Sequence, residues 1–486
     1  MTVTSATRSL VPDADERRRS LVWLLPWTTG RRWWAQPLGL GAGLLVLRAV
    51  LLVVTRRPIF MNDSVEYVAL VDDLYVPRVR PPGVAVLWRL ALAGWPSLNA
   101  ILIAQSVAGV AAGVVLYFIA REIGLRCPAA LLVAAIASLT PSVLFFERVL
   151  LAESFAVVLL VCASWLVLVG LRTNVAAPWM LAGFVGAAAV LVRTAALPTL
   201  LVTAVLAALA TRGSVLRRAG AALAFGLALI VPLAGYGFAT YVDTRAITGE
   251  GHFGLQFTDG FAYFSATAPL TDCSDPQEPP AIRARICAIP GYLDRDPDGI
   301  SWGDGPVNDA LDGRRWIQRN EDLKGLAAEN VRRDPVGALR LAGGRAVRLL
   351  STYDNQYFTD GAPLAPQLEA LDLPVPERSG PTERAWGAVM DVWAVARWLL
   401  WIGMLVGLTL VPRRWARGGR ELLMILLPAV VTMVWFAWTI TAVSRYLFPF
   451  EWVGVLAVGW SAQVALDAWR PTSGSATPTA PALMED

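Results

Sequence analysis

Acidic side chains gather directly after the first long apolar run of the chain, in the segment NDSVEYVALVDDLY. Asp63 and Glu66 are three residues apart, so a helix there would carry both on one face. Carboxylates beside an apolar membrane surface are unfavourable unless they are solvated, paired or used in a reaction. One such use is general-base chemistry, in which a carboxylate accepts the proton of an attacking hydroxyl. The alternatives are an N-cap role for Asp63 and simple solvation for Asp72 and Asp73.

Arginines elsewhere in the chain could supply positive charge for the same reaction. Arg445 stands in SRYLFPF, at the start of the last apolar run, and Arg193 stands in VRTAALP, between two apolar runs. A guanidinium can hold a phosphate through two parallel hydrogen bonds and so stabilise its departure. The alternatives are an interfacial arginine that reaches the lipid headgroups for Arg445, and a structural role for Arg193. Closer in sequence to the carboxylates stand other possible partners: Arg56, Arg57, Arg78 and Arg80.

Two more carboxylates and one aromatic segment could belong to the same site. Glu147 and Glu153, in FFERVLLAESF, could pair with arginines or bind a divalent cation such as Mg²⁺, Mn²⁺ or Ca²⁺ together with Asp63. The segment STYDNQYF could contact an acceptor sugar, although an aromatic belt at the membrane surface explains it as well. Its candidate residues are Tyr353, Asp354 and Tyr357.

Metal sites of the familiar kinds are not indicated by the sequence. His252 is the single histidine, so a zinc site with two histidines cannot form. The segment DRDPDGISWGDG begins like a calcium-binding loop, but Gly305 stands where the bidentate glutamate belongs and Pro297 interrupts the run. We interpret this segment as a turn.

The composition indicates how these residues are positioned. The chain has 486 residues, of which 56% are hydrophobic and only 16% charged, a balance that a water-soluble globule cannot keep off its surface. We therefore expect an all-α polytopic membrane protein. Arginines cluster in short segments between the apolar runs, as the positive-inside rule expects of cytoplasmic loops, so the net charge of +4 does not indicate nucleic-acid binding.

A membrane span needs about 20 mostly apolar residues, and ten segments qualify. The N-terminus is expected in the cytoplasm, and the arginine-rich loops then all fall on the cytoplasmic side. The short segment 81–94 carries Arg89 and is expected to be a re-entrant or juxtamembrane helix, so the total is about ten or eleven. The ten predicted spans lie near 38–54, 98–120, 128–146, 149–171, 176–192, 194–210, 216–240, 388–411, 421–441 and 446–468.

The same topology divides the chain into parts. The polar part 241–385 is expected outside the cytoplasm, with a helix over 314–334. It contains Cys273 and Cys287, which we expect to be bridged because disulfides persist there; two free thiols are the alternative. The parts are a cytoplasmic or interfacial N-terminus (1–37), a transmembrane core (38–240) with a first outer loop (55–97), the extracytoplasmic part (241–385), C-terminal transmembrane helices (386–469) and a disordered cytoplasmic tail (470–486).

Several quoted motifs, in this order, resemble those of the GT-C glycosyltransferases, multispanning enzymes that take sugar from a polyprenyl-phosphate carrier. The first loop, with NDSVEYVALVDDLY followed by RPPGVAVLWRL, is similar to that of bacterial protein mannosyltransferases, aminoarabinose transferases and cell-wall arabinosyltransferases. FFERVLLAESF, VRTAALP and SRYLFPF follow at outer-side positions. The resemblance covers the membrane part, about two-thirds of the chain.

The resemblance implies a function and roles for particular residues. Asp63 corresponds to the catalytic aspartate of the first loop and Glu66 to a second acidic position, while Arg445 and Arg193 would hold the donor phosphate. The implied reaction is an inverting transfer to an extracytoplasmic glycan, glycolipid or protein hydroxyl, by an enzyme of the plasma (inner) membrane whose site faces outward. Some relatives use a divalent cation and others do not, so the cofactor stays open.

Two other classes of function remain as alternatives. A transporter or flippase for a lipid-linked sugar would also place arginines and carboxylates near the membrane, but such proteins usually show internal repeats. Seven spans, a large loop and three spans show no such symmetry. A non-catalytic subunit that binds glycolipid would keep the arginines and need no base.

Overall fold

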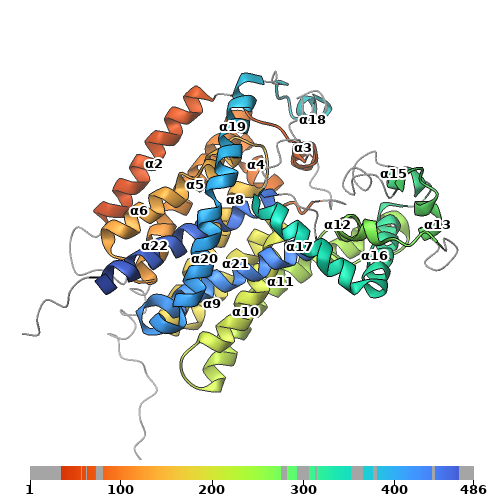
Figure 1. Ribbon diagram of the computed structural model, residues 1–486. Helices are drawn as coiled ribbons and strands as arrows, with labels where there is room; N and C mark the ends of the chain where they lie inside the picture. The colour runs from red at the N-terminus through yellow and green to blue at the C-terminus, as the bar shows by residue number, and fades with distance from the viewer. Residues whose placement is uncertain are drawn as a thin grey trace, which may run out of the picture.

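The computed structural model of the chain is built of helices (Figure 1). Within the described residues, extended pairing is limited to one bridge, between Ile59 and Val149. The acceptor-site candidates Tyr353, Asp354 and Tyr357, and the predicted tail 470–486, lie outside the described residues. Those residues are 34–55, 57–61, 63–72, 80–274, 282–292, 306–311, 313, 315–351, 365–375, 380–439 and 444–469.

Six helices of the described chain are long and apolar enough to cross a membrane. The fifth of them combines α19 (Gly380–Ala396) and α20 (Trp398–Leu410) into one apolar stretch, Thr382–Leu410. The prediction of an all-α polytopic membrane protein is confirmed. The other five are α2 (Ala35–Val54), α5 (Leu98–Glu122), α8 (Glu153–Thr173), α11 (Val215–Thr248) and α21 (Arg420–Thr439).

The other four predicted spans do not meet that criterion. The segment 128–146 is divided into α6 (Cys127–Ser138) and α7 (Pro141–Phe146), because Pro141 has no N–H to continue a helix and instead begins the next one. Arg193 is extended and separates two further short helices. The remaining helices at predicted spans are α9 (Ala176–Val192), α10 (Leu197–Ala210) and α22 (Glu451–Trp469), while the segment expected to be too short forms α4 (Gly83–Gly94).

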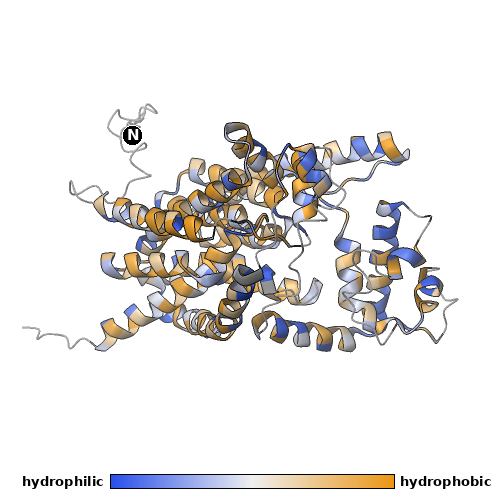
Figure 2. Ribbon diagram, turned by 90° about the horizontal axis from the view of Figure 1, so that it is seen from above, coloured by the Kyte–Doolittle hydropathy of each residue, from blue (hydrophilic) through white to orange (hydrophobic). Residues whose placement is uncertain are grey.

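A smaller group of helices lies to one side of the bundle, at the right in both ribbon views, and is more hydrophilic than the bundle (Figure 2). The helix predicted over 314–334 is present there as α16. This group has its own apolar core, to which Phe261, Phe264, Leu323 and Leu326 belong. Its elements are α12 (Asp259–Thr267), α13 (Ile282–Cys287), α15 (Pro306–Ala310) and α16 (Trp316–Arg333); α17 (Pro335–Ser351) leads back to the bundle, and α18 (Ala365–Ala370) follows.

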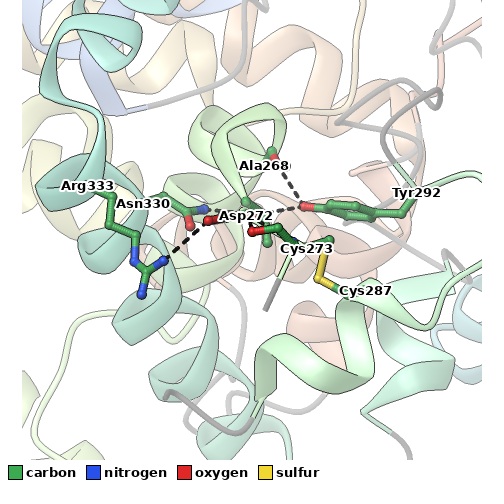
Figure 3. Close-up of a disulfide and its surroundings, with 9 residues drawn as sticks. Ala268, Asp272, Cys273, Cys287, Tyr292, Asn330 and Arg333 are labelled. Atoms are coloured by element: carbon green, nitrogen blue, oxygen red, sulfur yellow. Dashed lines mark hydrogen bonds and ion pairs between the residues drawn. A yellow bond between two sulfur atoms is a disulfide. The ribbon is translucent and has the colours of Figure 1, made fainter. Parts of the chain in front are cut away.

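A disulfide bond joins Cys273 to Cys287 within the smaller group, as the sequence predicts (Figure 3). Beside it, the Tyr292 hydroxyl donates to the carbonyl of Ala268 over 2.9 Å and lies 3.0 Å from the hydroxyl of Thr271. These buried bonds fix the segment after α12 against the chain that follows α13.

The entry to the first loop is fixed by the bundle itself. The N–H of Ile59 donates to the carbonyl of Arg148 over 2.8 Å, and the N–H of Leu150 donates back to Ile59 over 3.1 Å. Helix α3 (Ser64–Asp72) then begins with the Ser64 hydroxyl accepting a hydrogen bond from the N–H of Met61 at 3.0 Å. Asp63 therefore comes directly after a segment that the bundle holds in place.

Candidate functional site

Asp63 is held between two arginines that come from distant parts of the chain. The Nη2 atom of Arg80, in the segment before α4, lies 2.8 Å from Asp63 Oδ2. The Nη2 atom of Arg445, in the short helix η8 (Ser444–Tyr446), donates to the same oxygen. The Asp63 and Arg80 side chains are each 20% exposed and that of Arg445 is 13% exposed. One carboxylate oxygen is thus shared by two guanidiniums at a place that solvent reaches.

Glu66 belongs to the same cluster through Arg80. Asp63 directly precedes α3 and Glu66 lies in its first turn, and the Nε atom of Arg80 donates to Glu66 Oε2 over 2.8 Å. The Glu66 side chain is 41% exposed. Arg80 therefore bridges two carboxylates, and the more accessible of them faces water.

Arg193 belongs to the cluster through its contact with the Tyr446 ring. Its guanidinium carbon lies 5.0 Å from the centre of the Tyr446 ring, and that of Arg445 lies 5.7 Å from the same ring. Arg193 also pairs with the buried Glu153 at the start of α8. The aromatic ring thus holds two cations by cation–π attraction, and Glu153 fixes the orientation of one of them.

The environment shifts the pKa values of Asp63 and Glu66 in opposite directions. Burial disfavours the charged form of Asp63, but the positive charges of Arg445 and Arg80 outweigh it and lower the pKa of Asp63 to about 2. Burial raises the pKa of Glu66, and the charge of Asp63 adds to this rise against the opposing charge of Arg80. Asp63 is therefore the more strongly ionised of the two.

Glu147 pairs with an arginine, which is one of the two possibilities that the sequence leaves open for it, but this arginine lies outside the cluster around Asp63. The Arg48 guanidinium, from α2, binds Glu147 through Nε and Nη2 at 2.9 and 2.7 Å and also donates to the carbonyl of Ser138 over 2.9 Å. Both side chains are almost fully buried. A buried arginine within an apolar span attracts the nearest carboxylate, and this pairing removes Glu147 from the cluster around Asp63.

The carboxylates of the site are already paired with arginines. Asp63, Glu66 and Glu153 are each paired with a guanidinium, which competes with a metal for the carboxylate oxygens. In the part of the chain that the structure describes, no three Asp, Glu, His or Cys side chains form a group that could hold a metal ion. We derive no step through a metal at this site.

Sequence reasoning did not identify two members of the cluster. Arg80 is one of four arginines that could pair with the first-loop carboxylates, and two of the others, Arg56 and Arg78, lie outside the described residues. Tyr446 follows Arg445 directly in the sequence, but its contact with Arg193 is visible only in the fold. His252, which was given no role, lies in the loop after α11 with its ring edge-on to Phe257.

Comparisons with known proteins give the following results. No family model matches the sequence, and no curated protein matches it. The chain is similar to the oligosaccharyltransferase of Archaeoglobus fulgidus in its apo form, with 13% identity and a TM-score of 0.45 over 91% of this chain and 51% of that one. It is also similar to the archaeal oligosaccharyltransferase AglB in complex with an inhibitory peptide and a dolichol-phosphate, with 14% identity and a TM-score of 0.46 over 90% and 51%. The chain spans about half the length of these proteins.

Proposed function

We propose that the chain is a membrane glycosyltransferase of the GT-C type, which transfers a sugar from a polyprenyl-phosphate donor to a hydroxyl outside the cytoplasm. The observation that carries the proposal is the single carboxylate oxygen of Asp63 shared by the guanidiniums of Arg80 and Arg445. Helix α3 lies at one end of the bundle, beside α18 (Figure 1). A cationic pair at such an end can bind a phosphate while the lipid tail stays between apolar helices.

Donor binding is the first step of the proposed mechanism. The donor phosphate carries negative charge and competes with Asp63 for Arg445 and Arg80, while Arg193 lies against the same Tyr446 ring as Arg445. Guanidiniums bind phosphate oxygens through paired, charge-assisted hydrogen bonds. Once the phosphate neutralises these cations, the influence that lowers the pKa of Asp63 weakens, and the carboxylate becomes a better base.

Sugar transfer follows as a single displacement. Asp63 accepts the proton of the acceptor hydroxyl, and the hydroxyl oxygen forms a bond to the anomeric carbon of the sugar. The bond between that carbon and the phosphate oxygen breaks, and its electron pair stays on the phosphate, where the arginines stabilise the added charge. Attack from the face opposite the leaving group inverts the anomeric carbon.

Glu66 has a supporting role in this proposal. It holds Arg80 through Nε, so that Nη2 remains directed at Asp63 and at the phosphate that replaces it. Because Glu66 is more exposed than Asp63 and has a raised pKa, it can also pass the accepted proton to water. Loss of Glu66 should therefore reduce turnover less than loss of Asp63.

The proposal extends to substrates and location. The acceptor is a cell-wall glycan, a glycolipid or a protein hydroxyl, and Tyr353, Asp354 and Tyr357 are proposed to contact it. The sugar is of the mannose or arabinose kind, and the enzyme acts in the plasma membrane with its site facing outward. Since the paired carboxylates leave no donor set for a dication, a chelator such as EDTA should leave turnover unchanged.

The test compares Asp63, which directly precedes α3, with Asp72, the last residue of α3, in membranes that contain the donor. Asp63→Asn should reduce sugar transfer at least about 10²-fold, the lower range for loss of a general base. Asp72→Asn is the matched control, because Asp72 is exposed at the end of α3. This variant should transfer sugar at the parent rate. Parent-like transfer by a folded Asp63→Asn protein would refute the proposal, and purified protein that moves the donor lipid without sugar transfer would favour a transporter.

A further inference from the structure

Helix α17 carries two faces of different character. One face is buried against the protein and contains Ala338, Ala342, Arg345 and Leu349. Large apolar side chains are exposed elsewhere on the same helix: Val336 is 58% exposed, Leu339 66% and Val347 59%. A helix in water would rarely leave three such side chains uncovered along one stretch.

The exposed side chains of α17 form two adjacent sectors. At about 100° per residue, Val336, Leu339 and Val347 fall within roughly 80° of one another on the helix surface. Arg340 and Arg348, also exposed, occupy the next sector around the helix. An apolar sector bordered by basic residues is the pattern of a helix that lies in the membrane interface.

The depth of α17 is set by Arg345. Its Nε donates to the carbonyl of Ala437 over 2.9 Å, and its Nη1 donates to the carbonyl of Ala266 over 2.5 Å. Ala437 is in the last turn of α21, a candidate membrane span. Trp435 and Trp438 are exposed at the same end of α21, 46% and 38%, as tryptophans are at membrane–water boundaries. Arg345 therefore fixes α17 at the level where a span ends.

We propose that α17 is an interfacial helix that rests on the bilayer surface. Val336, Leu339 and Val347 enter the boundary between headgroups and acyl chains, and Arg340 and Arg348 bind anionic headgroups. The occupant of this face is the lipid surface, because α17 packs against α21, whose end carries exposed tryptophans, and because its basic border complements anionic lipid. Helix α17 also packs against η8, which carries Arg445, so the bilayer would support the segment that holds this arginine. The inference itself does not depend on the proposed reaction.

The experiment places a fluorescent label on the full-length chain in vesicles. A Cys127→Ser, Cys162→Ser background removes the free thiols and leaves the disulfide intact. Leu339→Cys, with Val347→Cys as a second position, carries the label on the apolar sector of α17. Glu321→Cys is the matched control, since Glu321 is exposed on α16 in the hydrophilic group. The readout is quenching by nitroxide-labelled phospholipid.

The label at residue 339 or 347 should be quenched severalfold more than the label at 321. Equal quenching at the two positions would overturn the proposal. A label with blue-shifted emission but no quenching would overturn it as well, because protein, either a second copy or another part of this chain, would then cover this face. A second arm compares phosphatidylcholine vesicles with and without phosphatidylglycerol. Quenching at 339 should be stronger with the anionic lipid, and Arg340→Gln should reduce that difference; an unchanged difference would overturn the role of the basic sector.

Discussion

Two clusters in this protein join carboxylates to arginines, and they differ in how the carboxylate is used. In the inner cluster, the Nε and Nη2 atoms of Arg48 together occupy both oxygens of Glu147. In the outer cluster, Arg80 and Arg445 share a single oxygen of Asp63. The inner side chains are at most 1% exposed, whereas those of Asp63 and Arg80 are each 20% exposed.

The surroundings of the inner cluster explain this difference. Gly109 makes room for the pair, since a Cβ atom built there would lie 1.9 Å from Glu147 Oε1. The cavity that borders Glu147 is about 20 Å³, enough for one water molecule and too small for a sugar phosphate. In a buried pair closed in this way the two charges satisfy each other inside the bundle, whereas a shared oxygen at an accessible end leaves the arginines hydrogen-bond capacity for an anionic ligand.

The largest effect expected from this comparison concerns folding. Glu147→Gln leaves the Arg48 charge buried without a carboxylate and should lower the free energy of unfolding by about 3–5 kcal/mol. Denaturant unfolding of the purified protein in detergent measures this change. Asp63→Asn should lower the same free energy less, because solvent and Glu66 remain near the arginines. An equal or larger loss for Asp63→Asn would remove the distinction between the clusters.

The second effect concerns donor binding. Arg445→Gln removes a charged hydrogen-bond donor and should weaken the binding of polyprenyl phosphate by about 1.5–3 kcal/mol, roughly 10- to 100-fold in Kd. Titration of the purified variant with polyprenyl phosphate measures the constant. Arg285→Gln, on the exposed side of α13 in the smaller helix group, serves as a control that removes the same charge outside the cluster around Asp63. Equal weakening by both variants would argue that only overall charge matters.

A smaller effect sharpens the comparison further. The double variant Arg48→Leu, Glu147→Leu replaces the inner pair by apolar side chains, and such replacements are often neutral or stabilising. It should therefore regain most of the stability that Glu147→Gln loses and should retain sugar transfer. Unfolding and turnover are measured on the same preparation. A stable double variant without turnover would give the inner pair a role in the reaction.

The smallest effect concerns pH. The pKa of Asp63 is about 2, so Asp63 stays ionised throughout the working range, whereas the raised pKa of Glu66 makes it the first of the two to protonate as the pH falls. Protonated Glu66 holds Arg80 less well, so kcat/KM should decline on the acid side. Glutamine does not titrate, so in Glu66→Gln kcat/KM should stay constant as the pH falls to about 4. That value is the ordinary pKa of a glutamate, and the raised pKa of Glu66 lies above it. An unchanged acid limb in the variant would exclude Glu66 as its cause.

Local spacing and charge indicated several residues that the structure brings together. The three-residue interval grouped Asp63 with Glu66, and the charges beside apolar runs identified Arg445 and Arg193. The ion pair between Arg80 and Asp63 depends on where the segment before α4 lies in the fold, and no local sequence pattern contains this information. Glu147 was assigned with Glu153 because they are close in sequence, but its partner is Arg48 on the first long helix.

The fold was predictable for similar reasons. Long apolar runs identified the six helices of the described residues that are long and apolar enough to cross a membrane, and two cysteines in one polar part identified the disulfide. Hydropathy averages over interruptions, so the break at Pro141 was not foreseen. The two-sided character of α17 was also missed, because its exposed valines and leucine become unusual only when the buried face is known.

Binding and turnover by purified Asp63→Asn, measured side by side, test the role of Asp63 most directly. The substitution removes the anion that competes for Arg80 and Arg445, so polyprenyl phosphate should bind at least as tightly as to the parent protein. Sugar transfer should nevertheless fall at least about 10²-fold, because no carboxylate accepts the proton. Intact binding together with transfer at the parent rate would contradict a catalytic role for Asp63.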